Sequence, residues 1–215
     1  AGIFQFTEKG AQKFCKRAKP KSIIDISAIT SIYRPGPLSA NVDQTYVQAK
    51  NNPKDISYLH DIVKDVTKET YGYLIFQEQI ALLAHRLGDN ISLDEGNTLR
   101  KLLTKKGTGD HETKSHAVSY SILSYQCAYL LNYYPSEWMA AFLDKEPEKR
   151  KERAINTAKS MGFRIRGLDI NASGEVWEIA PEDNKTLIQP LTSVKGLGES
   201  AIMQILNNRP FNSVD

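Results

Sequence analysis

The chain has 215 residues, of which 40% are hydrophobic and 25% are charged, and its 28 basic and 25 acidic side chains give a formal net charge of +3. This composition is too apolar and too weakly charged for a chain that is disordered throughout. The sequence has no run of about 18 uncharged apolar residues and no secretory leader pattern, which argues against a membrane protein. Cys15 and Cys127 lack metal-ligand spacing, so we expect reduced thiols in a cytoplasmic protein.

The first part of the chain is predicted to consist of short helices. Apolar spacing and capping residues predict helices over 7–19, 23–32 and 59–66. Two prolines and a glycine in Tyr33-Arg34-Pro35-Gly36-Pro37 end the second helix, so Arg34 is expected on a stiff turn. Residues 39–57 are predicted to be a polar connection.

The middle of the chain contains the clearest helical patterns. Residues 71–76 are predicted to be extended, and residues 77–87 to form an amphipathic helix. Ser92, followed three residues later by Glu95, indicates a capping box. Ser115 is expected to open the most hydrophobic helix, buried on more than one side and broken at Pro135.

The character of the sequence changes near residues 145–150. A charged segment leads into a helix that is expected to end near Met161, with Gly162 as its C′ residue. Short alternating segments then predict a strand over 163–165 and a hairpin around 181–184. The predicted fold is therefore mainly α, with a helical domain over residues 1–148 and a small α+β domain over 149–215.

No self-contained active site is visible in the sequence. HExxH, Walker A and GxSxG motifs are missing, and the four histidines do not share metal-ligand spacings with Cys, Asp or Glu. We therefore assign no catalytic residue and no metal ligand.

Cationic side chains on rigid elements are the first candidate binding residues. Lys114, Ser115 and His116 fall at a predicted helix N-terminus, whose free amides and partial positive charge suit a phosphate. The stiffly held Arg34 is a further candidate. Basic side chains also close the preceding helix: Arg100, Lys101, Lys105 and Lys106. The alternative interpretation is a solvated charged surface with an N-capping serine.

Residues 191–206 match a helix-hairpin-helix pattern. Its turn is Lys195-Gly196-Leu197-Gly198, where glycine lets backbone amides approach a phosphate without an intervening Cβ. Such contacts grip the DNA backbone regardless of sequence and weaken with salt. The alternative is an ordinary packing element of two helices.

Several segments resemble bacterial family C replicative DNA polymerases, the polymerase III alpha subunit and its relatives. The resemblance covers nearly the whole chain in the family's order. It is carried by GIFQF (2–6), YRPGPL (33–38), ETYGYLIFQEQI (69–80), LRKLLTKK (99–106), KSHAVSYSILSYQCAYLLNYYPSEWMAAFL (114–143) and LTSVKGLGESAI (191–202).

The resemblance implies a polymerase fingers domain followed by a helix-hairpin-helix. It implies that Arg34 approaches the triphosphate of the incoming dNTP, that Arg100 and Lys101 line the triphosphate or template, and that Ser115 and His116 lie near the sugar or nascent pair. Gln77 and Glu78 match the family without an assigned role. The catalytic aspartates and their Mg²⁺ belong to a palm domain, so we expect no cofactor in this chain and no activity from it alone. The expected partners are primer–template DNA, dNTP and the other polymerase domains, with unknown replisome proteins and no membrane.

One departure from the family concerns the connection between the two basic motifs. The family usually has several tens of residues there, whereas only residues 107–113 separate the motifs here. An engineered deletion and a compact phage-type relative both fit, and the relative placement of Arg100 and His116 is left open. The rival function is a non-enzymatic helix-hairpin-helix DNA-binding module with a helical protein-interaction domain. A freestanding metal-dependent nuclease would need ligands that the sequence lacks.

Overall fold

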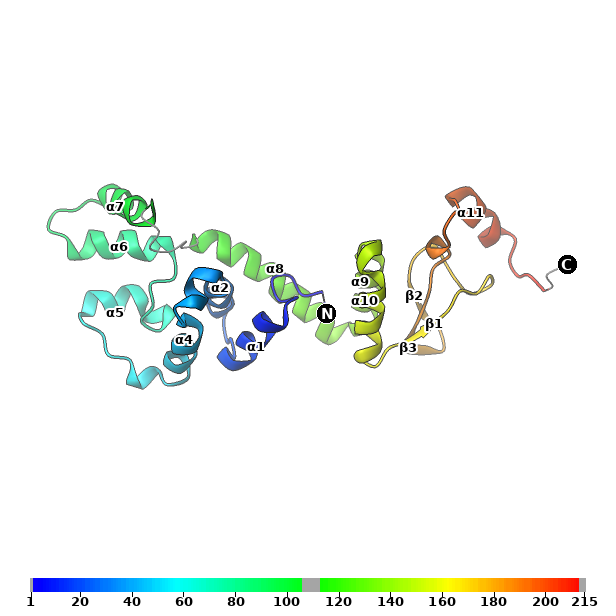
Figure 1. Ribbon diagram of the computed structural model, residues 1–215, viewed down its shortest axis with the longest axis horizontal. Helices are drawn as coiled ribbons and strands as arrows, with labels where there is room; N and C mark the ends of the chain where they lie inside the picture. The colour runs from blue at the N-terminus through cyan, green and yellow to red at the C-terminus, as the bar shows by residue number, and fades with distance from the viewer. Residues whose placement is uncertain (1, 106–112, 213–215) are drawn as a thin grey trace. The chain divides into compact units, whose positions relative to one another are not determined.

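A computed structural model describes residues 2–105 and 113–212, and it is mainly helical with one small sheet (Figure 1). This confirms the predicted fold class. The chain divides into two compact units, residues 3–126 and residues 127 onward together with Gly2, and the division falls within helix α8 (Lys114–Tyr133).

The first unit contains the predicted series of short helices. Helix α6 has the predicted bounds, and the Ser92–Glu95 capping box is present: the Ser92 amide and hydroxyl both donate to Glu95 Oε2 at 2.8 Å, which lowers the pKa of that carboxyl. The elements before α8 are α1 (Lys9–Ala18), α2 (Ile23–Ile32), α3 (Pro35–Ser39), α4 (Val42–Asn51), η1 (Pro53–Asp55), α5 (Asp61–Thr67), η2 (Lys68–Thr70), α6 (Gln77–Leu87) and α7 (Leu93–Lys105).

Helix α4 lies within the segment that was predicted to be a polar connection, and that prediction was wrong. The helix is mostly polar, so its apolar period is weak, but Tyr46 is fully buried. The Tyr46 ring packs edge-on against Phe14, with centroids 6.4 Å apart, and against Tyr71 at 5.7 Å. One large aromatic side chain therefore anchors a helix that hydrophobic periodicity does not reveal.

A buried ion pair lies beside Tyr46. Lys50 Nζ is 3.1 Å from Asp25 Oδ2, both side chains are almost fully buried, and the Tyr71 hydroxyl donates to Asp25 Oδ1 at 3.1 Å. Burial, followed by the charge of Asp25, raises the pKa of Tyr46 and of Tyr71. These hydroxyls stay protonated, so the cluster ties α2 to α4 rather than offering a nucleophile.

Helix α8 packs on α2 through small side chains. Ala117, Ser121 and Ser124 are buried, and the Ser27 hydroxyl donates to Ser121 Oγ at 3.0 Å. The large side chains beside them, Ile122, Leu123 and Tyr125, are exposed. The prediction that this helix is buried on more than one side was therefore wrong. The helix has apolar side chains around most of its circumference, but only one face packs in the core.

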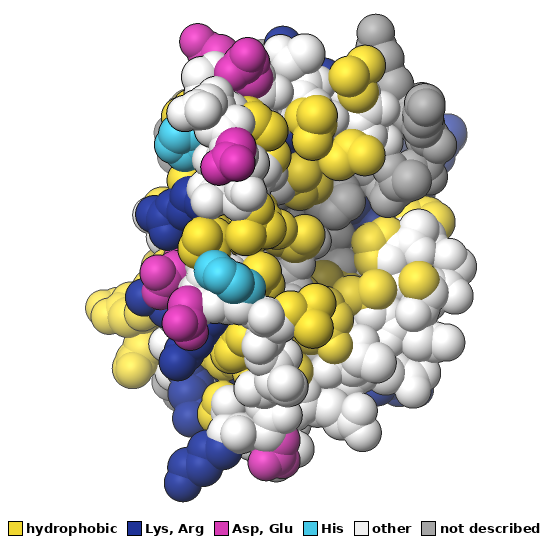
Figure 2. Space-filling view, turned by 90° about the vertical axis from the view of Figure 1, so that its left-hand side faces the viewer, with side chains coloured by type: hydrophobic (Ala, Val, Ile, Leu, Met, Phe, Trp, Pro, Cys, Tyr) yellow, Lys and Arg dark blue, Asp and Glu magenta, His cyan; other side chains and the backbone are white. Residues whose placement is uncertain are grey.

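Helices α6 and α7 form a close antiparallel pair. A Cβ at Gly96 would lie 2.6 Å from the Ala81 carbonyl oxygen, so the approach of the two backbones requires glycine. Figure 2 shows the end of the molecule at which these helices lie, where hydrophobic side chains gather across the face and Lys and Arg side chains follow one edge. The exposed large hydrophobic residues of the pair include Leu87, Leu93, Leu99, Leu102 and Leu103.

The second unit joins two helices to the sheet. Met139, Leu143, Ala158, Trp177 and Leu187 are buried in one cluster. The compact unit reaches back to Cys127, because α9 and α10 share their core with the strands. The domain boundary between 148 and 149 stays a prediction. Its elements after α8 are α9 (Pro135–Lys145), α10 (Glu148–Ser160), β1 (Arg164–Arg166), β2 (Glu178–Ala180), β3 (Asp183–Ile188), η3 (Leu191–Ser193) and α11 (Glu199–Asn207).

The sheet has the order β1-β3-β2. Strand β3 pairs antiparallel with β2, which confirms the predicted hairpin, and parallel with β1. Gly162 follows α10 with φ +87°, and the Phe163 amide donates to the Ala158 carbonyl at 3.1 Å. This is the predicted glycine C′ position, and it turns the chain from α10 into β1.

Candidate functional site

Arg34 lies at the end of α2, where the sequence predicts a rigid turn. Helix α2 ends at Ile32, Arg34 has extended backbone angles, and Pro35 occupies the first position of α3, where its missing amide costs nothing. The half-buried Arg34 lines a cavity of about 160 Å³. The other lining residues are Gln5, Thr30, Tyr33, Ala117 and Tyr120.

Tyr120 connects Arg34 to the start of α8. The His116 ring meets the Tyr120 ring edge-on with centroids 4.3 Å apart, and Phe4 stacks on Tyr120 at 5.3 Å. His116 and Ser115 are exposed on the first turn of α8. Arg34 and Tyr120 thus border one cavity, and His116 contacts the same aromatic ring. Tyr120 is not among the residues to which the sequence analysis assigned a binding role.

Arg100 is held on the side of α7 that faces α6. Its Nε donates to Asn97 Oδ1 at 2.8 Å, and Nη1 donates to Gln77 Oε1. Lys101, the next residue, is exposed. A second cavity, of about 330 Å³, lies beside Arg100. It is lined by Gln77, Glu78, Ala81, Leu93, Asn97, Arg100 and Thr113.

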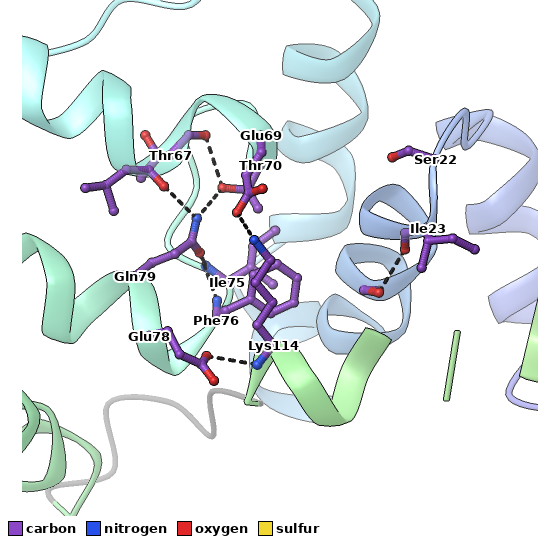
Figure 3. A network of polar contacts seen from close by, with 12 residues as sticks. Ser22, Ile23, Thr67, Glu69, Thr70, Ile75, Phe76, Glu78, Gln79 and Lys114 are labelled. Atoms are coloured by element: carbon purple, nitrogen blue, oxygen red, sulfur yellow. Dashed lines mark hydrogen bonds and ion pairs between the residues drawn. The ribbon is translucent and has the colours of Figure 1, made fainter. Parts of the chain in front are cut away.

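The start of α8 has carboxylate partners that sequence reasoning missed. The Lys114 amide donates to Glu78 Oε2 at 2.9 Å, and Lys114 Nζ forms an ion pair with Glu69 Oε1 at 2.5 Å (Figure 3). Part of the donor capacity that we expected to be free for a phosphate is therefore already used. Glu69 and Lys114 are far apart in sequence, so no local pattern could have revealed the pair.

Two further basic residues were predicted to contact DNA at the end of α7. Lys106 lies outside the described residues, as does the connection to Thr113. The backbone of Lys105 belongs to α7, whereas its side chain is outside the described part. Their predicted role stays a prediction.

The glycine turn of the second unit is open to solvent. Lys195, Gly196 and Gly198 are exposed, Leu197 is half-buried, and a Cβ built on either glycine would meet no atom within 4 Å. Gly196 has φ +89°, and Gly198 is the N-cap of α11. The turn therefore presents its backbone outward, as a phosphate contact requires.

The element before this turn is shorter than the helix-hairpin-helix pattern suggested. It is the single 3₁₀ turn η3, and it is attached to the loop that precedes β2. The Leu191 amide donates to the Gly174 carbonyl at 2.8 Å, and Thr192 Oγ1 donates to the Glu175 carbonyl at 2.8 Å. Bonds to that loop thus hold η3 in place.

Within residues 2–105 and 113–212, no group of three or more His, Cys, Asp and Glu side chains could hold a metal ion. No helix in the same ranges is long and apolar enough to span a membrane.

Comparisons with known proteins match both units. The profile of the bacterial DNA polymerase III alpha subunit finger domain matches residues 1–122, and a helix-hairpin-helix profile matches residues 162–215. DNA polymerase III subunit alpha of Treponema pallidum is 31% identical over 249 positions, which cover 99% of this chain and 21% of that protein. The subunits of Chlamydia muridarum and Staphylococcus epidermidis are each 31% identical to this chain. Each alignment covers 98% of this chain, and they cover 20% and 23% of the respective subunits.

The chain thus spans about a fifth of the length of these curated relatives. The alignment with the Treponema subunit has 249 positions, more than the 215 residues of this chain. That relative therefore carries residues with no counterpart here, in keeping with the shortening that the sequence suggested. A phage origin stays a prediction.

Proposed function

This chain belongs to the family of bacterial DNA polymerase III alpha subunits, and from that membership we propose that it binds the incoming dNTP and primer–template DNA during replication. It does so as part of a DNA-directed DNA polymerase, a nucleotidyltransferase. The proposal places the catalytic aspartates and the Mg²⁺ in a palm domain outside this chain. The chain on its own is then inactive.

The convergence of Arg34 and His116 on Tyr120 carries the nucleotide part of the proposal. Arg34 and Tyr120 come from two segments of the finger region and border one cavity, and the His116 ring packs edge-on against Tyr120. A triphosphate is strongly anionic, and fixed Arg and Lys donors stabilise it best when they need no rearrangement. We assign Arg34, Arg100, Lys101 and Lys114 to the phosphates, and Ser115 and His116 to the sugar or nascent pair.

The chemistry of phosphoryl transfer fits this division of labour. Phosphoryl transfer relies mainly on positioning and charge stabilisation, which the fingers supply while palm-held metal ions act on the reacting oxygens. Closure of the fingers over a correct base pair would bring the cations into place, so that specificity is coupled to a motion.

The glycine turn carries the DNA part of the proposal. Gly196 and Gly198 present open backbone beside the exposed Lys195, and Lys105 and Lys106 are assigned to the same duplex. Contacts of this kind position the duplex without reading its sequence.

Arg34→Ala tests the nucleotide site. In a polymerase that contains this chain, we expect the substitution to raise the KM for dNTP or lower kcat by about tenfold, the effect of losing one charge-assisted contact. Steady-state primer extension measures both constants. Arg17→Ala is the matched control, because Arg17 forms a surface ion pair with Asp43 on the same unit. Kinetics of Arg34→Ala equal to those of the control would remove Arg34 from the site.

A non-enzymatic DNA-binding module is the second candidate, and the exposed turn within the helix-hairpin-helix match favours it. The two functions differ in their response to nucleotide. Addition of dATP to the ¹⁵N-labelled chain perturbs the amides around Arg34 and His116 if the first proposal holds, and leaves them unchanged if the second does.

A further inference from the structure

The first three residues of α6 each contact a different part of the first unit. Gln79 is buried and uses its full hydrogen-bonding capacity: Oε1 accepts from the amides of Ile75 at 2.8 Å and Phe76 at 2.9 Å, and Nε2 donates to the Val66 carbonyl at 3.1 Å and Thr70 Oγ1 at 2.7 Å (Figure 3). These bonds fix the start of α6 to the end of α5 and to η2.

Glu78, the preceding residue, is exposed and reaches the start of α8. It accepts from the Lys114 amide, while Glu69 pairs with the Lys114 ammonium. Glu69 lies on η2, directly before Thr70, which Gln79 holds. Both carboxylates on Lys114 therefore rest on backbone that the buried Gln79 fixes in place.

Gln77 completes the set by holding α7. Its Oε1 accepts from the Arg100 guanidinium, and Gln77, Glu78, Arg100 and Thr113 line the same cavity of about 330 Å³. The segment Gln77–Gln79 thus contacts the Arg100 guanidinium of α7 and the backbone amide of Lys114 at the start of α8. Gln77 and Glu78 are neighbours on α6, so their contacts link the positions of Arg100 and Lys114 to one another.

We propose that Gln77–Gln79 is a positioning segment that orients Arg100 and Lys114 toward one anionic ligand, with Glu78 as the positioning residue for Lys114. The inference rests on the proposed function, because that function supplies the ligand, a nucleoside triphosphate. It gives a role to two residues that matched the family without one.

The charge of Glu78 and its positioning role predict opposite effects of its removal on the affinity for an anionic ligand. An exposed carboxylate near a cationic site repels an anion, so its removal alone would tighten binding. Loss of a hydrogen bond that orients Lys114 would instead weaken binding. The variants Glu78→Ala and Glu78→Gln separate the two effects, because only glutamine keeps an acceptor oxygen.

The test is an NMR titration of the ¹⁵N-labelled chain with dATP, followed at Lys114 and Arg100. We expect Glu78→Ala to weaken binding by about tenfold and Glu78→Gln to bind at least as tightly as the wild type. Asp65→Ala is the matched control, since it removes an exposed carboxylate from neighbouring α5. Tighter binding by Glu78→Ala, or binding equal to that of Asp65→Ala, would overturn the inference.

Amide hydrogen exchange separates this inference from the proposed function. Exchange of the Lys114 amide should be about tenfold faster in Glu78→Ala than in the wild type, and unchanged in Asp65→Ala. Equal exchange rates of the Lys114 amide in the wild type, Glu78→Ala and Asp65→Ala would refute the role of Glu78 in positioning Lys114, regardless of which ligand the chain binds. A wild type that binds no dATP at either cation, but shows the exchange difference, refutes the nucleotide site and leaves the contact between α6 and α8 established.

Discussion

The two candidate binding regions are built on opposite principles. The cations of the first unit are side chains held by other side chains: the Arg100 guanidinium by Gln77, and the Lys114 ammonium by Glu69. The turn of the second unit offers mainly backbone, and no atom lies within 4 Å of the Cβ positions of its glycines. The first region depends on a chain of contacts that reaches into the core, whereas the second depends on the local geometry of a few residues.

The largest effect is expected where the first region meets the core. Gln79→Ala leaves the buried amides of Ile75 and Phe76 without their acceptor and takes a donor from the Val66 carbonyl and Thr70 Oγ1. This should lower the free energy of unfolding by about 3–5 kcal/mol. Urea unfolding followed by far-UV circular dichroism measures this loss. Gln44→Ala, at an exposed site on α4, is the control and should cost less than about 0.5 kcal/mol. Equal stability of the two variants would show that the side-chain network is dispensable.

Substitutions in the glycine turn are expected to have smaller effects, one on stability and one on DNA binding. Gly196→Ala puts a Cβ at φ +89° and should lower stability by about 1–2 kcal/mol, whereas Gly198→Ala, at φ −83°, should change it by less than about 0.5 kcal/mol. Both variants should weaken binding to duplex DNA by about tenfold, because the new methyl group holds a phosphate away from the backbone.

Fluorescence anisotropy with a labelled duplex at two salt concentrations measures this binding. Gly167→Ala is the control, since its Cβ also meets open space but lies outside the turn. If all three variants bind equally well, the turn is not the DNA contact, and the contrast between the two regions loses its functional meaning.

The smallest effect concerns a half-buried carboxylate at the start of β3. A hydrogen bond from Thr186 and the ion pair with Arg164 lower the pKa of Asp183 from 3.8 to about 2. A carboxyl with a lowered folded-state pKa contributes stability above its unfolded pKa and loses it as the pH falls toward the folded value. Asp183→Asn should therefore flatten the loss of stability between about pH 4 and pH 2.

The fluorescence of Trp177, which is buried in the same unit, can follow this acid unfolding. Glu152→Gln, on the exposed face of α10, is the control and should retain the wild-type pH dependence. An acid transition of Asp183→Asn that matches the wild type would show that these contacts at the sheet add nothing to stability.

Local sequence patterns predicted the elements whose signals are themselves local. The Ser92–Glu95 capping box, the glycine after α10 and the helix over 77–87 were all found where expected, because each depends on residues within a few positions of one another. Helix α4 was missed, since its one strong anchor, Tyr46, gains its partners from other elements.

The candidate site shows the same division. The start of α8 and the stiff turn at Arg34 follow from proline, serine and helical spacing. The contacts of Glu69 and Glu78 with Lys114 join distant parts of the chain, and so does the stacking of Phe4 on Tyr120. Such pairs follow from packing, which one sequence without relatives does not specify.

Strand β3 lies at the centre of its sheet, and the glycine turn follows it in the chain after η3. On one edge, β3 forms a tight hairpin with β2, and hairpins form within microseconds. On its other edge, β3 pairs in parallel with β1, and such a pair needs a longer connection. The bonds from η3 run to Gly174 and Glu175, just ahead of β2. A transient separation of β1 from β3 would leave these bonds intact. The glycine turn can therefore keep its conformation while the β1 edge of the sheet opens.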